Sequence, residues 1–282
     1  MDGLLHATIQ YRDALMATKG EISRDDYDGE SWRETMTNLK DDGIALPLKI
    51  AFDVETRNAF SSHAGNNSVG GIHATTCFPP NCASKLKSIL VIELFRSKDR
   101  KRLGNDPILS NLIHELIKIR KHGIKITVKG KVYEIYLILS LVLGDNLRVN
   151  SLLAYTSSFT NTYCCRICEA SPDGIRGMVR EISKLIRTKE KYESDILQNC
   201  TSRGLTGYSL FNEVPDFHVL KAYVDVMHDV FEGVVPTVMS KILIVLIVNE
   251  KCVKVKDIND AFDKFDSILR KVTNPSISSL ST

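Results

Sequence analysis

Two aspartates each follow an apolar run of the kind that forms a buried strand. Asp53 closes the run KIAFD, and Asp145 closes the run LVLGD. A carboxylate at the end of a central strand is held rigidly, and two of them on neighbouring strands can bind Mg²⁺ together. Either aspartate alone fits an ordinary turn after a strand. Only the pair indicates a two-metal site.

A third group of acids lies in the segment YVDVMHDVFEGVV. His228 and Glu232 are four residues apart there, with Asp225 and Asp229 nearby, so a helix would bring them to one face. A solvated acidic helix face explains the same pattern. Both interpretations stay open from the residues alone.

The densest run of thiols is TYCCRICE. Its Cys165 and Cys168 have the CxxC spacing at which two thiolates bind one Zn²⁺, but a structural zinc site needs four ligands. No second CxxC exists, so the remaining ligands would come from scattered residues, chiefly Cys200, His218 and His228. Buried free cysteines are the plain alternative. A redox pair fits less well, because no strand and helix N-terminus of the thioredoxin kind surrounds the motif.

The composition is that of an ordinary folded protein. The chain has 282 residues, of which 43% are hydrophobic and 25% charged, enough to bury a core and too apolar for a disordered tail. Its longest apolar run, Ile242 to Val248, is far shorter than the roughly 20 residues that cross a bilayer, so we expect no membrane partner. The start lacks the pattern of an export signal, and the cysteines number seven. Both observations favour an intracellular, reducing compartment.

Positive charge is clustered, although the formal net charge of +3 is too small to indicate nucleic acid. One cluster spans residues 96–102 and another 118–131, and solvated loops would explain both. A third has helical spacing beside an apolar stripe that begins at Ile175. It therefore predicts a helix with one buried and one basic face. The cations of this third cluster are Arg176, Arg180, Lys184, Arg187 and Lys191.

The order of the elements indicates an α/β (α+β) fold with a mixed sheet. Strands are predicted at 44–56, 71–78 and 87–95, joined by turns as in an antiparallel meander. A helix follows with Asp106 as its cap and a proline at its first position, and it ends before Gly123.

A hairpin around Lys129-Gly130 and an apolar strand at 138–146 come next, and the pattern beyond residue 150 is helical. A last amphipathic helix is predicted over 258–272. We expect an N-terminal segment at 1–40, a core at 41–155, a helical insertion with the CxxC at 156–222, a C-terminal helical part at 223–273 and a disordered tail at 274–282.

Taken together and in order, these motifs resemble the transposases of CACTA (En/Spm-like) elements, within the CACTA, Mirage and Chapaev group. The segments that carry the resemblance are LPLKIAFDVETRNAFSSH, LSLVLGDNLRVNSLLAYTSSFTNTYCCRICEA and VDVMHDVFEGVV, and it covers roughly residues 40–250. The resemblance implies a ribonuclease H-like mixed sheet with a mainly helical insertion after the second catalytic strand. It also implies a DDE metal triad that cuts and joins DNA.

The resemblance implies roles for particular residues. Asp53, Asp145 and Glu232 would hold Mg²⁺ or Mn²⁺ as the catalytic acids. Cys165 and Cys168 would bind Zn²⁺, with His228 as a further metal ligand. The family's partner histidines usually form a closely spaced pair, and this sequence has no such pair.

The implied partner is DNA, either transposon ends or non-specific duplex, which places the protein in the nucleus and allows a homo-oligomer. Phosphates would be held in a salt-dependent way. The chain has no room for the further portions of full-length transposases, so a truncated enzyme and a catalytically inactive remnant that binds DNA or protein both fit. The expected DNA contacts are Arg100, Lys101, Arg102, Arg176, Arg180, Lys184 and Arg187.

Overall fold

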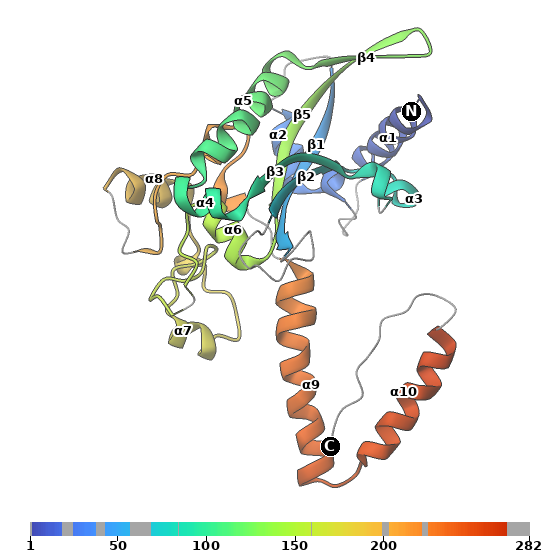
Figure 1. Ribbon diagram of the computed structural model, residues 1–282, viewed down its shortest axis with the longest axis vertical. Helices are drawn as coiled ribbons and strands as arrows, with labels where there is room; N and C mark the ends of the chain where they lie inside the picture. The colour runs from blue at the N-terminus through green and yellow to red at the C-terminus, as the bar shows by residue number, and fades with distance from the viewer. Residues whose placement is uncertain are drawn as a thin grey trace. The chain divides into compact units, whose positions relative to one another are not determined.

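The structure is a computed structural model with two compact units, Met1–Asp225 and Val226–Thr282 (Figure 1). For residues 2, 53–56 and 264–269 it describes the backbone alone. The residues described are 2–18, 25–37, 43–56, 69–83, 85–158, 160–198, 203–221 and 225–269. The tail predicted at 274–282 lies outside them.

A five-stranded mixed sheet forms the centre of the first unit, in the order β3-β2-β1-β5-β4. β1 (Ile44–Thr56), β2 (Val69–Thr76) and β3 (Leu90–Arg96) form an antiparallel meander. β5 (Lys131–Leu143) runs parallel to β1, and β4 (Ile124–Val128) pairs with β5 in an antiparallel hairpin. The mixed α/β class predicted from the sequence is confirmed.

The strand predictions agree with the structure in most details. β1 has the predicted bounds, and the hairpin turns at Lys129-Gly130, where both residues have positive φ (51° and 78°). The strand predicted at 138–146 is the second half of β5, which begins at Lys131 and ends at Leu143. Asp145 therefore lies just beyond the strand.

Helix α5 (Asp106–His122) packs on the sheet and confirms the predicted helix. Its apolar stripe, which includes Leu109 and Leu112, is buried in one hydrophobic cluster with strand residues such as Ile50. Each such leucine or isoleucine contributes about 1.5–3 kcal/mol by leaving water. The cap differs from the prediction, since Asn105 is the N-cap residue and makes no side-chain capping hydrogen bond.

The N-terminal segment is part of the folded core. It comprises α1 (Asp2–Met16), the short helix η1 (Asp26–Asp28) and α2 (Glu30–Thr37). Tyr27 is fully buried and Trp32 is 4% exposed, with ring centroids 5.9 Å apart in an edge-to-face arrangement. Both belong to a second hydrophobic cluster with residues of β1 and β5. Figure 1 shows α1 on the side of the sheet away from α5.

The segment after β5 contains only short helices where it is described. The helix with a basic stripe, predicted from residue 175 to 191, is wrong: a helix ends at Gly177, and Val179 is 94% exposed. Two glycines within the six residues PDGIRG explain the early end, because each costs about 1 kcal/mol in a helix. The short helices are α6 (Asn146–Leu152), α7 (Pro172–Gly177), η3 (Ser183–Leu185), α8 (Lys189–Leu197), η5 (Leu210–Glu213) and η6 (Val219–Lys221).

The second unit begins with a helical run of 24 residues, Val226–Asn249, which contains an 18-residue window of mean hydropathy 2.0. By length and composition alone it could cross a membrane, although its longest unbroken apolar stretch is the short run Ile242 to Val248. Its first turns carry His228, Asp229 and Glu232, and ionisable groups are costly inside a bilayer. The absence of a membrane partner stays a prediction. The run consists of η7 (Val226–Val234, π-helical), α9 (Val235–Ile244) and η8 (Val245–Asn249).

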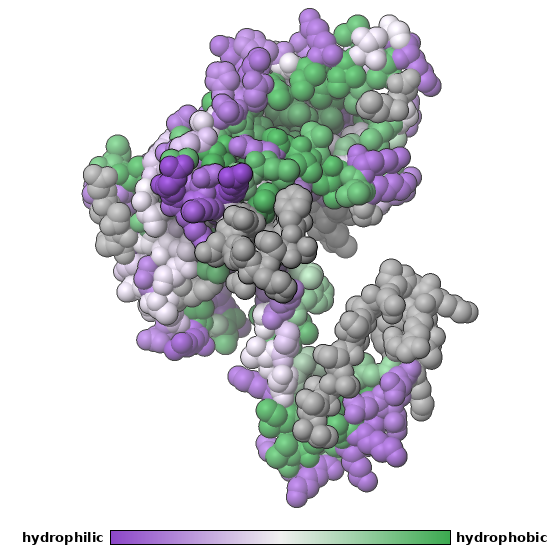
Figure 2. All heavy atoms as spheres, in the orientation of Figure 1, coloured by the Kyte–Doolittle hydropathy of each residue, from purple (hydrophilic) through white to green (hydrophobic). Residues whose placement is uncertain are grey.

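The last described element is α10 (Val255–Leu269), which confirms a final helix that begins three residues earlier than expected. In the first unit, Figure 2 shows hydrophobic residues gathered over the visible face. On the edge strand β3, Leu90, Val91 and Leu94 are each more than half exposed. Such a strand can pair with another chain. The homo-oligomer expected from the sequence stays a prediction.

Candidate metal site at the strand ends

β1 and β5 run side by side in the interior of the sheet, and their pairing stops where β5 ends at Leu143. Their parallel register pairs Ile50 with Val142 and Ala51 with Leu143. Asp53 lies two residues beyond Ala51, and Asp145 lies two residues beyond Leu143. Asp53 lies within β1, opposite Gly71 of β2, and Asp145 lies just beyond the end of β5. The two aspartates therefore belong to neighbouring strands at the same end of the sheet. The side chain of Asp53 lies outside what the structure describes.

Gly144 permits the close approach of the two strands at this edge. Its φ is 149°, and a Cβ added to it would lie 2.8 Å from the backbone carbonyl oxygen of Phe52. No larger residue could keep both this conformation and this contact. The glycine thus turns the chain out of β5 directly before Asp145.

Asp145 is the N-cap of α6, which holds its carboxylate in place. The backbone N–H of Arg148 donates to Oδ1 of Asp145 at 2.8 Å, and the Nε of Arg148 lies 3.9 Å from Oδ2. About a quarter of the Asp145 side chain is exposed. A carboxylate has about four acceptor positions, so this cap leaves several for a cation.

Arg100, expected to contact DNA, is held within the fold. Its guanidinium lies 4.7 Å from the ring centroid of Phe52 and donates to Asn105 Oδ1 at 2.8 Å and to Ser151 Oγ at 2.7 Å. This cation therefore ties α4 (Ser97–Leu103) to α6 and to the end of β1. The neighbouring Lys101 and Arg102 are exposed, and Arg102 lies 3.5 Å from Asp99.

The CxxC loop directs two backbone donors at its first cysteine. The backbone N–H groups of Ile167 and Cys168 point to Cys165 Sγ, at 3.3 and 3.4 Å. Burial raises the pKa of the Cys168 thiol, and the neighbouring Cys165 adds to the effect. The loop thus pairs one sulfur that accepts two N–H donors with one whose thiol pKa is raised by burial.

Arg166, inside the CxxC, ties the loop to the helix that Asp145 caps. Its side chain is buried and donates to Asn146 Oδ1 at 2.5 Å and to Asn150 Oδ1 at 3.3 Å. Asn146 directly follows Asp145 in the chain. The cysteine loop and the second aspartate therefore share one rigid support.

Arg187, expected to contact DNA, is a second cation that holds the loop. It is buried, with 6% of the residue exposed, and donates to the carbonyl oxygens of Cys165 at 3.1 Å and of Arg203 at 2.8 Å. Its guanidinium lies 5.5 Å from the ring centroid of Tyr155 and 3.8 Å from Glu169. A residue so enclosed serves the fold. Arg176, Arg180 and Lys184 are exposed, and their contact with DNA stays a prediction.

A complete zinc site is not assembled within the part of the chain that the structure describes. His218 lies edge-to-face against Tyr192, with ring centroids 5.1 Å apart, and burial lowers its pKa. His228 belongs to the second unit, and Cys200 lies outside the described residues. Cys165 and Cys168 therefore supply half of the four ligands that structural zinc requires.

A cluster that the sequence did not indicate brings Asp25, Asp26 and Cys77 together. Their ligand atoms lie within 4.8 Å of one another, the one such group of three or more in the described ranges. The ammonium of Lys49 lies 3.6 Å from Asp25 and 3.2 Å from Asp26. Burial raises the pKa of the Cys77 thiol, which keeps it neutral. A lysine already provides the cation here, so the cluster serves the fold.

Glu232, the expected third acid, lies in η7 and is described only within the second unit. The residues that the first unit does bring together are Asp145, the end of β1 and the cysteine loop. No protein-family model matches the chain, and a search of curated proteins finds no match. The case for a function therefore rests on these residues.

Proposed function

We propose that this chain is the catalytic core of a CACTA-type (En/Spm-like) transposase with a ribonuclease H-like sheet. The observation that carries the proposal is the parallel pair β1 and β5, whose last paired residues, Ala51 and Leu143, lie two residues before Asp53 and Asp145. The meander, the helix and the returning parallel strand support it, because this order places two carboxylates on neighbouring strands. Glu232 is the proposed third acid.

The reaction would be cleavage and joining of a phosphodiester in DNA. Mg²⁺ or Mn²⁺ bound by the three acids would activate water or a 3′-hydroxyl and stabilise the leaving oxygen. The chain's own contribution is rigid placement: the Arg148 N–H fixes Asp145, and Gly144 directs it away from the sheet. Arg148 also offsets part of the carboxylate charge before a cation binds.

DNA would lie against exposed cations, and the surface charges that fit this role are Lys101, Arg102, Arg176, Arg180 and Lys184. Phosphate contacts by such residues give affinity that falls steeply with salt. A nuclear location and assembly into a homo-oligomer follow from this proposal. Both belong to the same hypothesis.

The proposal is tested by cleavage of an end-labelled duplex at low salt, with Mn²⁺ or Mg²⁺ and with EDTA. We expect metal-dependent cutting by the wild-type chain and a loss of roughly 1,000-fold in Asp53→Asn, because one carboxylate contributes several kcal/mol through the metal. Asp13→Asn is the matched control, since Asp13 is exposed on α1 and its ion-pair partner among the described residues is the neighbouring Arg12. Equal cutting by Asp53→Asn and wild type would rule out a metal site at this edge.

The second candidate is an inactive remnant that binds DNA or protein. The observation in its favour is that Asp145 already has a structural role as the cap of α6, which a chain without catalysis would also keep. Binding of DNA without metal-dependent cutting by the wild-type chain would select this candidate.

Zinc is the other proposed metal, bound by Cys165 and Cys168 with ligands from elsewhere in the chain. We expect about one Zn²⁺ per purified wild-type chain and a loss of most of it in Cys165→Ser and in Cys168→Ser. Cys164→Ser is the matched control, because Cys164 is adjacent but outside the CxxC spacing. Zinc content measured by elemental analysis decides the point. Equal loss in all three variants, or no zinc in the wild type, would contradict the assignment.

A further inference from the structure

The β4–β5 hairpin extends beyond the end of α5 at one end of the sheet (Figure 1). Its turn is two residues long, and both Lys129 and Gly130 have positive φ, which matches the twist of the flanking strands. Side chains on both of its faces are exposed, from Ile124 to Val132, apart from the half-buried Val128. The hairpin is therefore a defined two-stranded ribbon with little of its surface used by the fold.

The hairpin and the end of α5 carry an excess of positive charge. Six cations lie between residues 118 and 131, and two have acidic partners: Lys118 lies 3.6 Å from Glu115 and Arg120 lies 2.6 Å from Asp216. The other four form no ion pair with any residue that the structure describes. They are Lys121, Lys125, Lys129 and Lys131, all exposed.

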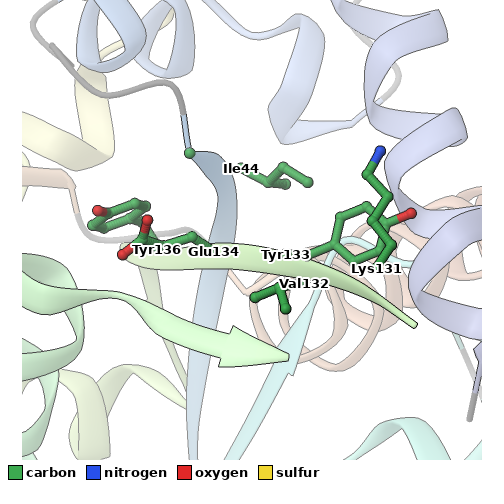
Figure 3. Close-up of a pocket in the computed structure, with 7 residues that line it drawn as sticks. Ile44, Lys131, Val132, Tyr133, Glu134 and Tyr136 are labelled. Carbon is green, nitrogen blue, oxygen red and sulfur yellow. The ribbon is translucent and has the colours of Figure 1, made fainter. Parts of the chain in front are cut away.

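The one acid of the hairpin faces away from most of these lysines. Glu134 lies opposite Lys125 in the register. Side chains alternate along a strand, so Glu134 points to the opposite face of β5 from Lys131 and Tyr133. Figure 3 shows it beside Tyr136. The ammonium of Lys131 lies 5.0 Å from the ring centroid of Tyr133, next to a cleft of about 430 Å³ at the hairpin base. Lys125 thus has Glu134 as its cross-strand neighbour, whereas Lys129 at the turn and Lys131 directly after it lie farther along the hairpin from this carboxylate.

The hairpin lies at the opposite end of β5 from Asp145. β5 has 13 residues, so at about 3.3 Å per residue its ends are about 40 Å apart. B-DNA rises 3.4 Å per base pair, so this span equals about 12 base pairs. A single straight duplex can therefore reach both ends of the strand.

From these observations, we infer that the β4–β5 hairpin is a duplex-binding ribbon that contacts DNA phosphates about 12 base pairs from the site of cleavage. The major groove of B-DNA admits a two-stranded ribbon, and the exposed lysines complement the phosphates on its rims. The inference rests on the proposed function, which makes duplex DNA the partner. It adds a binding element on the far end of the sheet from the metal site.

The test is the affinity of the full chain for a labelled duplex of about 30 base pairs, long enough to span both ends of β5. Anisotropy is measured in EDTA at several salt concentrations, so that cleavage has no part in the result. The variant carries Lys125→Gln, Lys129→Gln and Lys131→Gln. The matched control carries Lys85→Gln, Lys87→Gln and Lys189→Gln, which remove the same charge from exposed sites elsewhere.

We expect the hairpin variant to bind roughly 100-fold more weakly at low salt and to lose about 2.7 from the slope of log affinity against log salt, while the control loses less than about 1. Equal losses in the two variants would overturn the inference. So would a hairpin variant that loses binding to anionic lipid vesicles but keeps its affinity for DNA. If DNA binding depends on the hairpin but no metal-dependent cutting is seen, the inference stands and the catalytic proposal is refuted. If the chain cuts DNA but its binding does not depend on the hairpin, the catalytic proposal stands and the inference is refuted.

Discussion

Asp145→Asn is expected to abolish metal-dependent cleavage while leaving the stability of the chain nearly unchanged. Asparagine caps a helix as well as aspartate does, and its side-chain oxygen can still accept from the Arg148 N–H. Asparagine lacks the negative charge with which aspartate binds a divalent cation. We therefore expect cleavage to fall roughly 1,000-fold and the free energy of unfolding in urea to change by less than about 0.5 kcal/mol.

Asp145→Ala separates the two roles of this side chain, because it removes both the cap and the charge. It should lose the same activity and also about 1 kcal/mol of stability. If Asp145→Asn cuts DNA like the wild type while Asp145→Ala is destabilised, Asp145 is only a cap. The two-metal proposal would then lose one of its three acids.

Local patterns were enough to predict the sheet that carries the two aspartates. An apolar run that ends in Gly144-Asp145 and a proline after Asp106 are signals within a few residues, and the structure confirms β5 and α5 from them. The parallel pairing of β1 with β5 is a long-range contact. The sequence indicates this pairing only indirectly, because two acids that share a metal site must lie on neighbouring strands.

The packing of charged and aromatic groups could not be predicted, because their partners are distant in the sequence. Tyr27 is fully buried although it lies in a polar segment, and its hydroxyl donates to the carbonyl oxygen of Cys77 at 3.2 Å. The basic stripe after residue 175 had the spacing of a helix. Two glycines end the helix early, and an isolated pairing of Cys168 with Ile186 accompanies an irregular chain with only short helices there.

Arg187 shows how partners that are distant in the sequence can change the role expected for a residue. From its spacing, it was expected on a solvated face that meets DNA. In the structure it lies under the cysteine loop, near Glu169 and Tyr155. Arg187→Met would leave the carbonyl oxygens of Cys165 and Arg203 without their donors, and each unsatisfied buried group costs about 1–3 kcal/mol. We expect a loss of about 3 kcal/mol or more in the free energy of unfolding.

Urea unfolding of Arg187→Met and Arg176→Met tests this expectation with a matched pair. Arg176 belongs to the same predicted stripe, but its side chain is 81% exposed and pairs with the exposed Asp173 at 3.1 Å. An exposed pair contributes little, so Arg176→Met should change stability by less than about 0.5 kcal/mol. If Arg187→Met is equally stable and instead binds DNA more weakly, the original prediction of a DNA contact is right. A large loss of stability confined to Arg187→Met would show that this cation holds the cysteine loop against α6.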